Sequence, residues 1–380
     1  MISLPRRELF QLLSLSGGGY KGVFTLEVLK AIEKKRFCFE GPSRLDHGRI
    51  QDCCDGFVGT SVGAIISAGL AIGKSPSELL EIFHEHGDKI FPGIPGPGYI
   101  SSRYSKKHLE GLLREIFGDR TFSELKKPCY VSAVDAETGN TLLIGGYKSS
   151  SLHYENTKIW QAVQASVSAP TYFPFQKYGF TQGDKENEGS SGWLVDGGIS
   201  ANAPELLAVA DLSKNFGVSL SDFFVLSVGT TDHAVDLEAP SKIRTREGHV
   251  PPRVQRLARW GRDIYLRTLK SKDSTRWGAI AWFINGRINL VELILRSQVN
   301  VAVRICENLI PHKQYVRIDL SLPLSDRVEF DDPTKHKTLC QLGQKMAGDL
   351  FARRSTQAYR VGLFVNRKNT SHSSLDVNRH

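Results

Sequence analysis

The feature that most constrains the fold is a glycine-flanked serine between an apolar run and a helical pattern. Residues 57–66 read Phe-Val-Gly-Thr-Ser-Val-Gly-Ala-Ile-Ile, which predicts a strand, a tight turn at Ser61 and a helix. Gly59 and Gly63 carry no Cβ atom that would collide at such a turn. The helix directs N–H groups and the positive end of its dipole towards the serine hydroxyl. Ser61 is therefore a candidate nucleophile, although a chain with 35 glycines also produces such a motif by chance.

A second glycine motif follows the first predicted strand. Residues 10–16 predict a buried strand that leads into Gly17-Gly18-Gly19-Tyr20-Lys21-Gly22, and residues 23–32 predict a helix. Successive N–H groups of such a loop face one point, which suits a phosphate or an oxyanion equally. The loop also fits the Gly-x-Gly-x-x-Gly pattern of a Rossmann-like dinucleotide-binding protein, with Glu40 lying 18 residues beyond it, after Phe37-Cys38-Phe39. That alternative leaves the serine turn unexplained.

The third motif is an aspartate at the end of a predicted strand. Trp193-Leu194-Val195 predicts a strand that delivers Asp196 to its carboxyl end, and Gly197 and Gly198 leave the carboxylate uncovered. In a parallel sheet, ligands bind beside the carboxyl ends of the strands. Further strands are predicted at residues 129–134, 142–144, 223–228 and 315–318.

The second half of the chain differs in composition from the first. Residues 230–252 are polar and rich in turn formers, and we take them as the main boundary. Apolar residues then keep helical spacing from Ile288 to Leu309, which predicts a long helix that buries one face against the core or against another subunit. A helix at residues 338–351 and a disordered tail at residues 366–380 are predicted beyond it. Before the long helix, arginines recur at every third position, with Trp260 among them: Arg253, Arg256, Arg259 and Arg262.

Composition limits the partners and the compartment. A formal charge of +9 favours anionic partners, such as a nucleotide or an anionic membrane surface, unless the basic surface is simply solvated. The six cysteines show no metal-binding spacing and predict reduced thiols, with no metal and no cofactor. No secretion signal and no membrane-spanning run is evident, so we expect a cytoplasmic protein with at most peripheral contact to the inner face of the membrane.

The three motifs together resemble those of the patatin-like phospholipases, and the resemblance covers residues 8 to about 230. It implies a three-layer α/β/α fold with a mostly parallel central sheet and additional C-terminal helices. It also implies a catalytic core at residues 8–232, a C-terminal extension packed on it at residues 233–365, and a tail. The implied activity is hydrolysis of phospholipid acyl esters through an acyl-enzyme.

The resemblance implies Ser61 as nucleophile, Asp196 as general base and the loop Gly17, Gly18 and Gly19 as oxyanion hole. Supporting positions in the same motifs are Lys21, Gly22, Gly59, Gly63, Gly197 and Gly198. A carboxylate in a water-poor site has its basicity raised by desolvation, so no histidine is required. An α/β-hydrolase triad that uses His312 or His336 remains an alternative, as does a binding module that kept the fold.

Within the family, the length and layout are similar to those of bacterial anti-phage effectors that a cyclic oligonucleotide activates. That likeness implies a nucleotide-gated phospholipase in antiviral defence. Arg253, Arg256 and Arg259, with Trp260, are then the candidate nucleotide-binding residues, since arginines bind phosphate and an indole stacks on a base. An exposed basic helix is the alternative for this stripe. Self-association through the long apolar helix would couple binding to activity.

Overall fold

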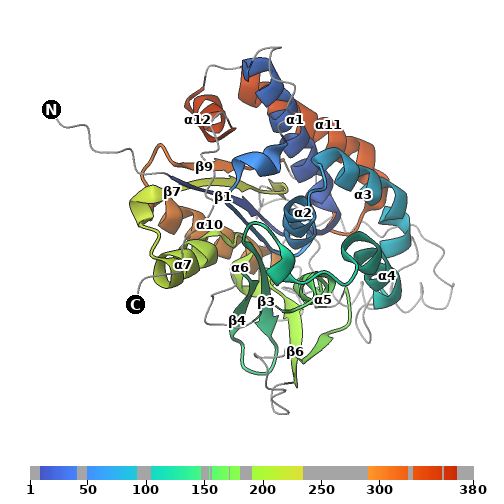
Figure 1. The fold of residues 1–380 in the computed structure, drawn as a ribbon. Helices are drawn as coiled ribbons and strands as arrows, with labels where there is room; N and C mark the ends of the chain where they lie inside the picture. Colours follow the sequence, from blue (N-terminus) through green and yellow to red (C-terminus); the bar gives the residue numbers. More distant parts are fainter. Residues whose placement is uncertain are drawn as a thin grey trace, which may run out of the picture.

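The structure is a computed structural model that describes residues 9–40, 49–91, 104–146, 154, 156–170, 172–179, 191–233, 290–323, 328–352 and 355–365. The predicted arginine stripe with Trp260 and the predicted tail at residues 366–380 lie outside these residues. A mixed sheet crosses the molecule, with helices on both of its faces (Figure 1). The chain therefore has the predicted three-layer α/β/α fold.

The central sheet has eight strands in the order β5-β6-β3-β2-β1-β7-β9, with β4 paired to β3. Strands β3, β2, β1, β7 and β9 run parallel, whereas β4 and β6 run antiparallel to β3. A separate pair joins β8 (Asp232–His233) to β10 (Ser321–Leu322). The strands of the central sheet are β1 (Phe10–Leu15), β2 (Gly56–Gly59), β3 (Cys129–Asp135), β4 (Thr141–Gly145), β5 (Gln176–Gly179), β6 (Ser191–Asp196), β7 (Phe223–Val228) and β9 (Tyr315–Ile318).

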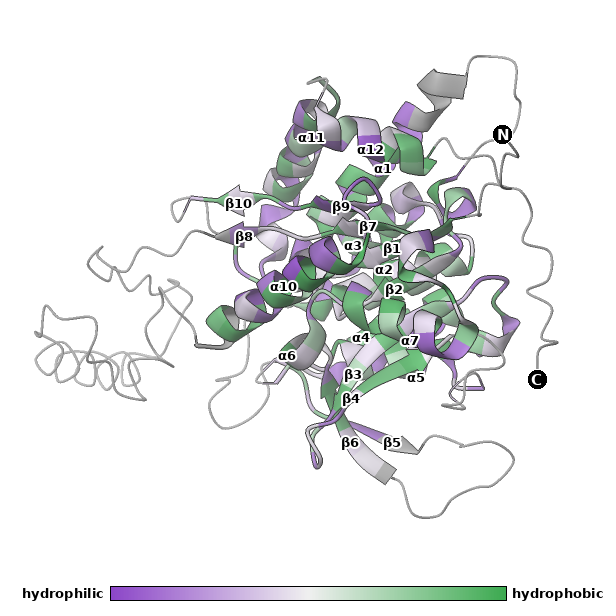
Figure 2. Cartoon of the chain, turned by 90° about the vertical axis from the view of Figure 1, so that its left-hand side faces the viewer, coloured by the Kyte–Doolittle hydropathy of each residue, from purple (hydrophilic) through white to green (hydrophobic). Residues whose placement is uncertain are grey.

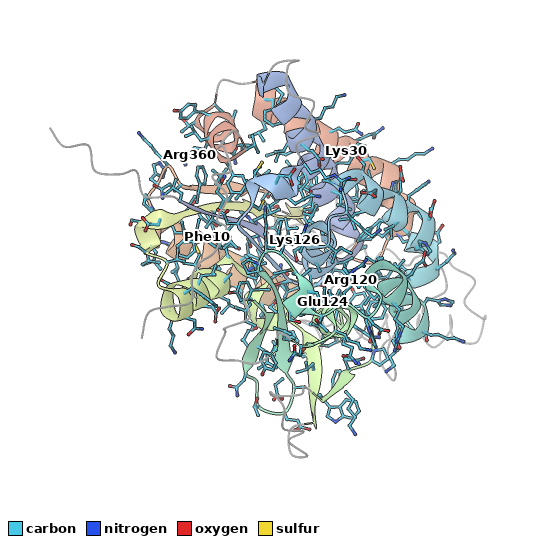
Figure 3. All side chains as sticks on the ribbon, in the orientation of Figure 1. Phe10, Lys30, Arg120, Glu124, Lys126 and Arg360 are labelled. Atoms are coloured by element: carbon cyan, nitrogen blue, oxygen red, sulfur yellow. The ribbon has the colours of Figure 1, made fainter. Side chains whose placement is uncertain are left out.

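Alternating side chains of the buried strands supply two cores, one on each face of the sheet. Leu13 and Leu15 of β1 pack with α1 and α2, whereas Leu12 packs with α7 and α10 on the opposite face. Hydrophobic residues accordingly concentrate in the interior (Figure 2), and side chains fill the space between the layers (Figure 3). The helices are α1 (Gly22–Glu40), α2 (Val62–Ala71), α3 (Pro76–Ile90), α4 (Lys106–Phe117), α5 (Ile159–Ser166), α6 (Gly198–Ala201), α7 (Glu205–Phe216), α10 (Leu290–Leu309), α11 (His336–Ala352) and α12 (Thr356–Val365).

The direction of β6 differs from the expectation that placed Asp196 at the end of a strand in a parallel sheet. β6 is antiparallel to β3, and only its last three residues pair with that strand, with Asp196 opposite Ala133. In the parallel pair of β2 and β3, Gly59 lies opposite Val131, two residues earlier along β3. The end of β6 therefore reaches the carboxyl edge of the parallel strands from outside the sheet.

The C-terminal part of the chain contributes to the same sheet as the N-terminal part. β9 extends the sheet beyond β7, α11 packs along α1, and α12 contacts β7 and β9. The division of the chain at residues 232 and 233 stays a prediction. None of the described helices combines the length and the hydropathy that a membrane span requires.

Candidate active site

Ser61 occupies a strained turn between β2 and α2. Its backbone has φ 54° and ψ −125°, and it is the one non-glycine residue with positive φ among the residues that the structure describes. Such a conformation costs about 1–3 kcal/mol and persists only where the surroundings enforce it. The turn places the hydroxyl beyond the end of β2, at the amino end of α2.

Close backbone packing enforces this turn. A Cβ atom on Gly59 would lie 2.2 Å from the carbonyl oxygen of Gly63, and a Cβ atom on Gly63 would lie 2.2 Å from that of Leu15. Side chains at either position would push α2 away from the sheet. The N–H group of Ser61 itself donates to Ser166 Oγ at 2.9 Å, so a residue of α5 also holds the turn.

Asp196 lies directly against the serine. Ser61 Oγ donates to Asp196 Oδ2 at 2.7 Å, and the N–H group of Gly198 donates to Oδ1 at 2.7 Å. The backbone of Asp196 is fixed in turn, because its N–H group donates to the carbonyl of Ser168 at 3.1 Å. A Cβ atom on Gly197 would lie 2.2 Å from Ser132 Oγ, which shows how closely this turn packs on β3.

Burial changes the acidity of Asp196. Its side chain is 4% exposed, and desolvation raises its pKa from 3.8 to about 6, although the hydrogen bonds from Ser61 and Gly198 oppose the shift. Burial penalises the charged carboxylate, so the group binds a proton more tightly than an aspartate in water. The carboxylate is thereby a stronger base and still ionises near neutral pH.

The glycine loop lies against the serine and is held from several sides. A Cβ atom on Gly17 would lie 3.1 Å from Ser61 Cβ, and the N–H group of Gly17 donates to the carbonyl of Asn202 at 3.1 Å. Gly19 has φ 58°, a conformation that favours glycine. For the N–H groups of Gly18 and Gly19, the described part of the chain offers no hydrogen-bond acceptor.

The remaining positions of the loop motif pack around it. Lys21 Nζ donates to the carbonyl of Thr231 at 3.1 Å, which ties the loop to the segment after β7. A Cβ atom on Gly22 would lie 2.4 Å from a methyl group of Val62, so glycine there lets α1 start close to α2.

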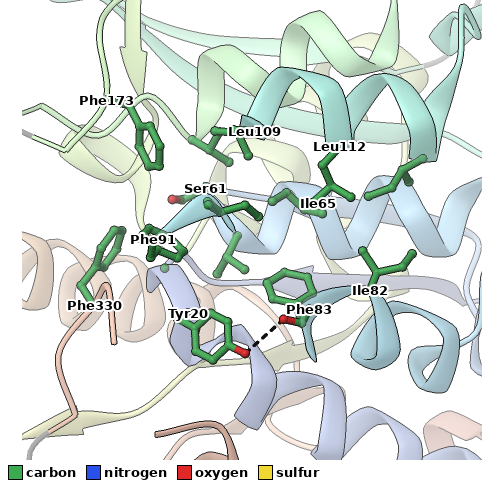
Figure 4. Close-up of a pocket in the computed structure, with 15 residues that line it drawn as sticks. Tyr20, Ser61, Ile65, Ile82, Phe83, Phe91, Leu109, Leu112, Phe173 and Phe330 are labelled. Carbon is green, nitrogen blue, oxygen red and sulfur yellow. Dashed lines mark hydrogen bonds between the residues drawn. The ribbon is translucent and has the colours of Figure 1, made fainter. Parts of the chain in front are cut away.

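An apolar pocket opens beside Ser61 (Figure 4). It encloses about 550 Å³ of empty space, part of which is open to solvent. Apart from the serine hydroxyl and the Tyr20 hydroxyl, its walls carry apolar side chains. The sequence motifs did not predict these walls, which come from α2, α3, α4 and three loops: Ile65, Ile82, Phe83, Ile90, Phe91, Leu109, Leu112, Ile116, Val167, Phe173 and Phe330.

The two histidines of the triad alternative lie elsewhere. His336 Nδ1 lies 2.8 Å from the hydroxyl of Tyr20, and its ring packs on His84. His312 is exposed and precedes β9, so it lies at the amino edge of the parallel strands, opposite Ser61. Because Ser61 Oγ bonds directly to Asp196, no imidazole stands between the two groups.

The dinucleotide alternative requires a second strand that ends at Glu40. Residues 37–40 instead continue α1, which runs without a break from Gly22 to Glu40. Among the described residues, no three side chains of His, Cys, Asp or Glu are grouped as a metal site would need. The thiols of Cys129, Cys306 and Cys340 are not joined in disulfides.

Comparison with known proteins gives a family match over the N-terminal half. The family described as "Patatin-like phospholipase" matches residues 13–209. A cGAMP-activated phospholipase of Vibrio cholerae is 27% identical over 259 residues, covering 63% of this chain and 69% of the relative. A cGAMP-activated phospholipase of Escherichia coli is 30% identical over 260 residues, which cover 64% of this chain and 68% of the relative. A cUMP-AMP-activated phospholipase of Escherichia coli is 31% identical over 229 residues, which cover 58% of this chain and 64% of the relative.

Proposed function

The chain belongs to the patatin-like phospholipase family, and we propose that it cleaves acyl esters of membrane phospholipids with Ser61 as nucleophile and Asp196 as general base. The observation that carries the proposal is the 2.7 Å hydrogen bond from Ser61 Oγ to Asp196 Oδ2 beside an apolar pocket. A serine hydroxyl attacks an ester only when a neighbouring base accepts its proton. The buried carboxylate of Asp196 is that base.

The reaction proceeds in two halves. Asp196 accepts the proton of Ser61 Oγ while that oxygen attacks the ester carbonyl carbon. The carbonyl oxygen becomes an oxyanion, which the N–H groups of Gly18 and Gly19 and the amino end of α2 stabilise. Protonated Asp196 then gives its proton to the departing alcohol oxygen as the ester C–O bond breaks, which leaves acyl-Ser61. A water that Asp196 deprotonates hydrolyses this ester, and the proton returns to Ser61 Oγ.

The pocket supports a lipid as substrate. Its apolar walls would bury the methylene groups of a fatty acyl chain, and each buried CH₂ contributes about 0.8 kcal/mol of binding. The formal charge of +9 would draw the protein to the anionic inner face of the membrane, where such chains are found. Contact of this kind is peripheral.

A fluorophosphonate probe and a lipid release assay test the proposal together. The probe should label Ser61, and phosphatidylglycerol vesicles should release fatty acid when the protein is present together with an activating cyclic dinucleotide. Ser61→Ala should abolish both signals, whereas Ser67→Ala, in the same helix, should keep both, because Ser67 does not line the pocket and its Oγ donates to the carbonyl of Ala64 at 3.3 Å. Labelling of wild-type protein at a residue other than Ser61 would refute the assignment of the nucleophile.

A cyclic dinucleotide is the activator that the relatives suggest. Three of them are named for activation by cGAMP or cUMP-AMP, and an ungated phospholipase would attack the membrane of its own cell. We therefore assign this chain a role in antiviral defence, with Arg253, Arg256, Arg259 and Trp260 contacting the nucleotide. Self-association would use α10, on which Ile294 and Val301 are 44% and 55% exposed.

The gate is tested by measuring fatty acid release and molecular mass with cGAMP, with cUMP-AMP and with neither. One nucleotide should activate strongly and increase the mass. Changing both Arg256 and Arg259 to Glu should remove the activation while Ser61 still reacts with the probe. Full activity of a monomer without nucleotide would rule the gate out.

A further inference from the structure

One wall residue of the pocket, Phe330, comes from the segment of residues 328–336, which lies far beyond the end of the family match at residue 209. The ring of Phe330 lines the pocket together with Ser61 and Phe173. Figure 4 shows Phe330 and Phe173 on one side of Ser61, with Ile82 and Leu112 on the other. The C-terminal part of the chain therefore contributes to the pocket wall on the same side of Ser61 as Phe173.

The backbone of Phe330 also contacts the glycine loop. Its carbonyl oxygen accepts the N–H group of Tyr20 at 2.8 Å. A Cβ atom on Gly19 would lie 2.3 Å from the same oxygen and 2.7 Å from the Phe330 ring, so the two segments are in close contact. The carbonyl of Phe330 thus holds the residue that directly follows Gly18 and Gly19, whose N–H groups are the candidate oxyanion donors.

Two side-chain hydrogen bonds hold this segment on the core. The hydroxyl of Tyr104 donates to Asp331 Oδ2 at 2.7 Å, and both side chains are buried. At the other end, His336 Nδ1 lies 2.8 Å from the Tyr20 hydroxyl. Tyr104 packs on the ring of Phe173, with 5.8 Å between ring centroids, so the same side chain joins the segment to the pocket wall.

We propose that Phe330 belongs to the active site and acts there in two separable ways. Its ring is a specificity-determining wall that favours long acyl chains over short ones. Its carbonyl positions the oxyanion loop, and Tyr104 is a positioning residue that holds this carbonyl in place through Asp331. The inference rests on the proposed function, since both roles concern the acylation of Ser61.

The role of the ring is measured with fluorophosphonates that carry a methyl or a dodecyl chain. Second-order rate constants for labelling Ser61 give a long-to-short ratio for each variant. Phe330→Ala should lower the ratio about tenfold, because only the dodecyl chain extends along the apolar walls. Phe330→Leu keeps an apolar side chain and should lower it about threefold, which keeps the test valid if the alanine variant does not fold.

Phe175→Ala is the matched control, because this ring is 48% exposed and does not line the pocket. Its long-to-short ratio should equal that of the wild type. An unchanged ratio in a folded Phe330 variant would overturn the role of the ring.

The role of the carbonyl is measured with Tyr104→Phe, which removes one hydroxyl and keeps the ring. Both probes should react about tenfold more slowly, with an unchanged ratio, because the oxyanion donors act on either probe. Tyr130→Phe is the matched control, since it removes a Tyr–Asp hydrogen bond of 2.9 Å, to Asp211, on the α7 face of the sheet. This variant should lose comparable stability and react at the wild-type rate. Wild-type rates in Tyr104→Phe would overturn the positioning role.

The outcomes separate this inference from the proposed function. If wild-type protein reacts at Ser61 but the variants match it in rate and ratio, only the roles of Phe330 and Tyr104 are wrong. If neither probe reacts at Ser61 in wild-type protein, the proposed nucleophile is wrong, and this inference is refuted with it.

Discussion

At the scale of single residues, Asp196 suits the proposed role of general base because it is buried and has a single hydroxyl as its side-chain partner. Ser61 Oγ and the N–H group of Gly198 are its two hydrogen-bond donors, and burial raises its pKa to about 6. A base must be unprotonated at the operating pH and must still bind a proton well. A carboxyl group with an ordinary pKa would be more fully unprotonated at neutral pH, but it would bind the serine proton less well.

Labelling of Ser61 should therefore depend on pH through Asp196. The protonated carboxyl group cannot accept the serine proton, so the rate should rise as pH increases through about 6 and become constant above it. The measurement is the labelling rate constant of a short fluorophosphonate between about pH 4.5 and about pH 8.5. His336→Gln should keep the same midpoint of the pH profile, whatever its absolute rate, since this histidine contacts Tyr20 and not Ser61. A rate that is constant across pH 6 would contradict the role of Asp196.

Replacing the buried charge should increase stability while it abolishes activity. The pKa of Asp196 is raised in the folded protein, so the folded state binds more protons than the unfolded state between pH 3.8 and about 6. The stability contributed by the protonated group is complete below pH 3.8 and is lost as pH rises through about 6. Asp196→Asn removes this loss and should gain up to about 3 kcal/mol in free energy of unfolding at pH 8.

Urea unfolding of Asp196→Asn and of the wild type at acidic and at alkaline pH measures this effect. The advantage of the variant should shrink as the pH falls towards 4. Ser61→Ala serves as the control, because it abolishes labelling without removing the buried charge. An asparagine variant that loses stability at pH 8 would show that burial of the charged carboxylate does not destabilise the folded protein.

The residues that carry local motifs could be located from the sequence, and the residues that complete the site could not. Ser61 and Asp196 each follow a predicted strand beside glycines, and the structure joins their side chains by a hydrogen bond. Phe330 and Tyr104 carry no local signal, because their place in the site depends on contacts with segments far away in the chain. The same holds for Ser166, whose bond to Ser61 joins residues 105 positions apart in the chain.

At the scale of the elements, the contact of α2 with the sheet depends on glycine. Gly63→Ala should destabilise the protein by about 3 kcal/mol or more and reduce labelling of Ser61, because the new methyl group would overlap the backbone of Leu15. Gly111→Ala, in α4, is the control with open space around it and should stabilise by about 0.5–1 kcal/mol through helix propensity. Urea denaturation measures both changes. A Gly63→Ala variant as stable as the wild type would contradict the close packing.

Apolar strands and amphipathic helices were predictable because one residue pattern fixes each of them. The strands at β1, β2, β3, β7 and β9 are short apolar runs, and the structure contains all five. The antiparallel direction of β6 was not predictable, since a strand pattern reads alike in both directions. The edge strand β5 was missed because Gln-Lys-Tyr-Gly is short and polar, and α12 was missed because its pattern is weak outside its tertiary contacts.

At the scale of the whole molecule, the C-terminal helix joins the two ends of the described chain. The carbonyl groups of Phe364 and Val365 in α12 accept hydrogen bonds from Gln11 in β1 and from Cys53. The ring of Phe364 is fully buried and meets Phe224 of β7 edge to face, with 5.3 Å between ring centroids. An extension that only rested on a finished core would not supply such contacts to its central strands.

Truncating Phe364 should therefore weaken the whole sheet and not α12 alone. Phe364→Ala should cost about 3–5 kcal/mol, the usual loss for a buried aromatic ring, whereas Leu363→Ala, whose side chain is 42% exposed, should cost much less. Hydrogen exchange under native conditions separates the alternatives, because it reports the free energy of opening at each amide. If the C-terminal part and the core unfold together, amides of β1 and of β9 should lose the same protection in Phe364→Ala. Protection lost from β9 with β1 unchanged would show that residues beyond 233 form a separately stable unit on an independent core.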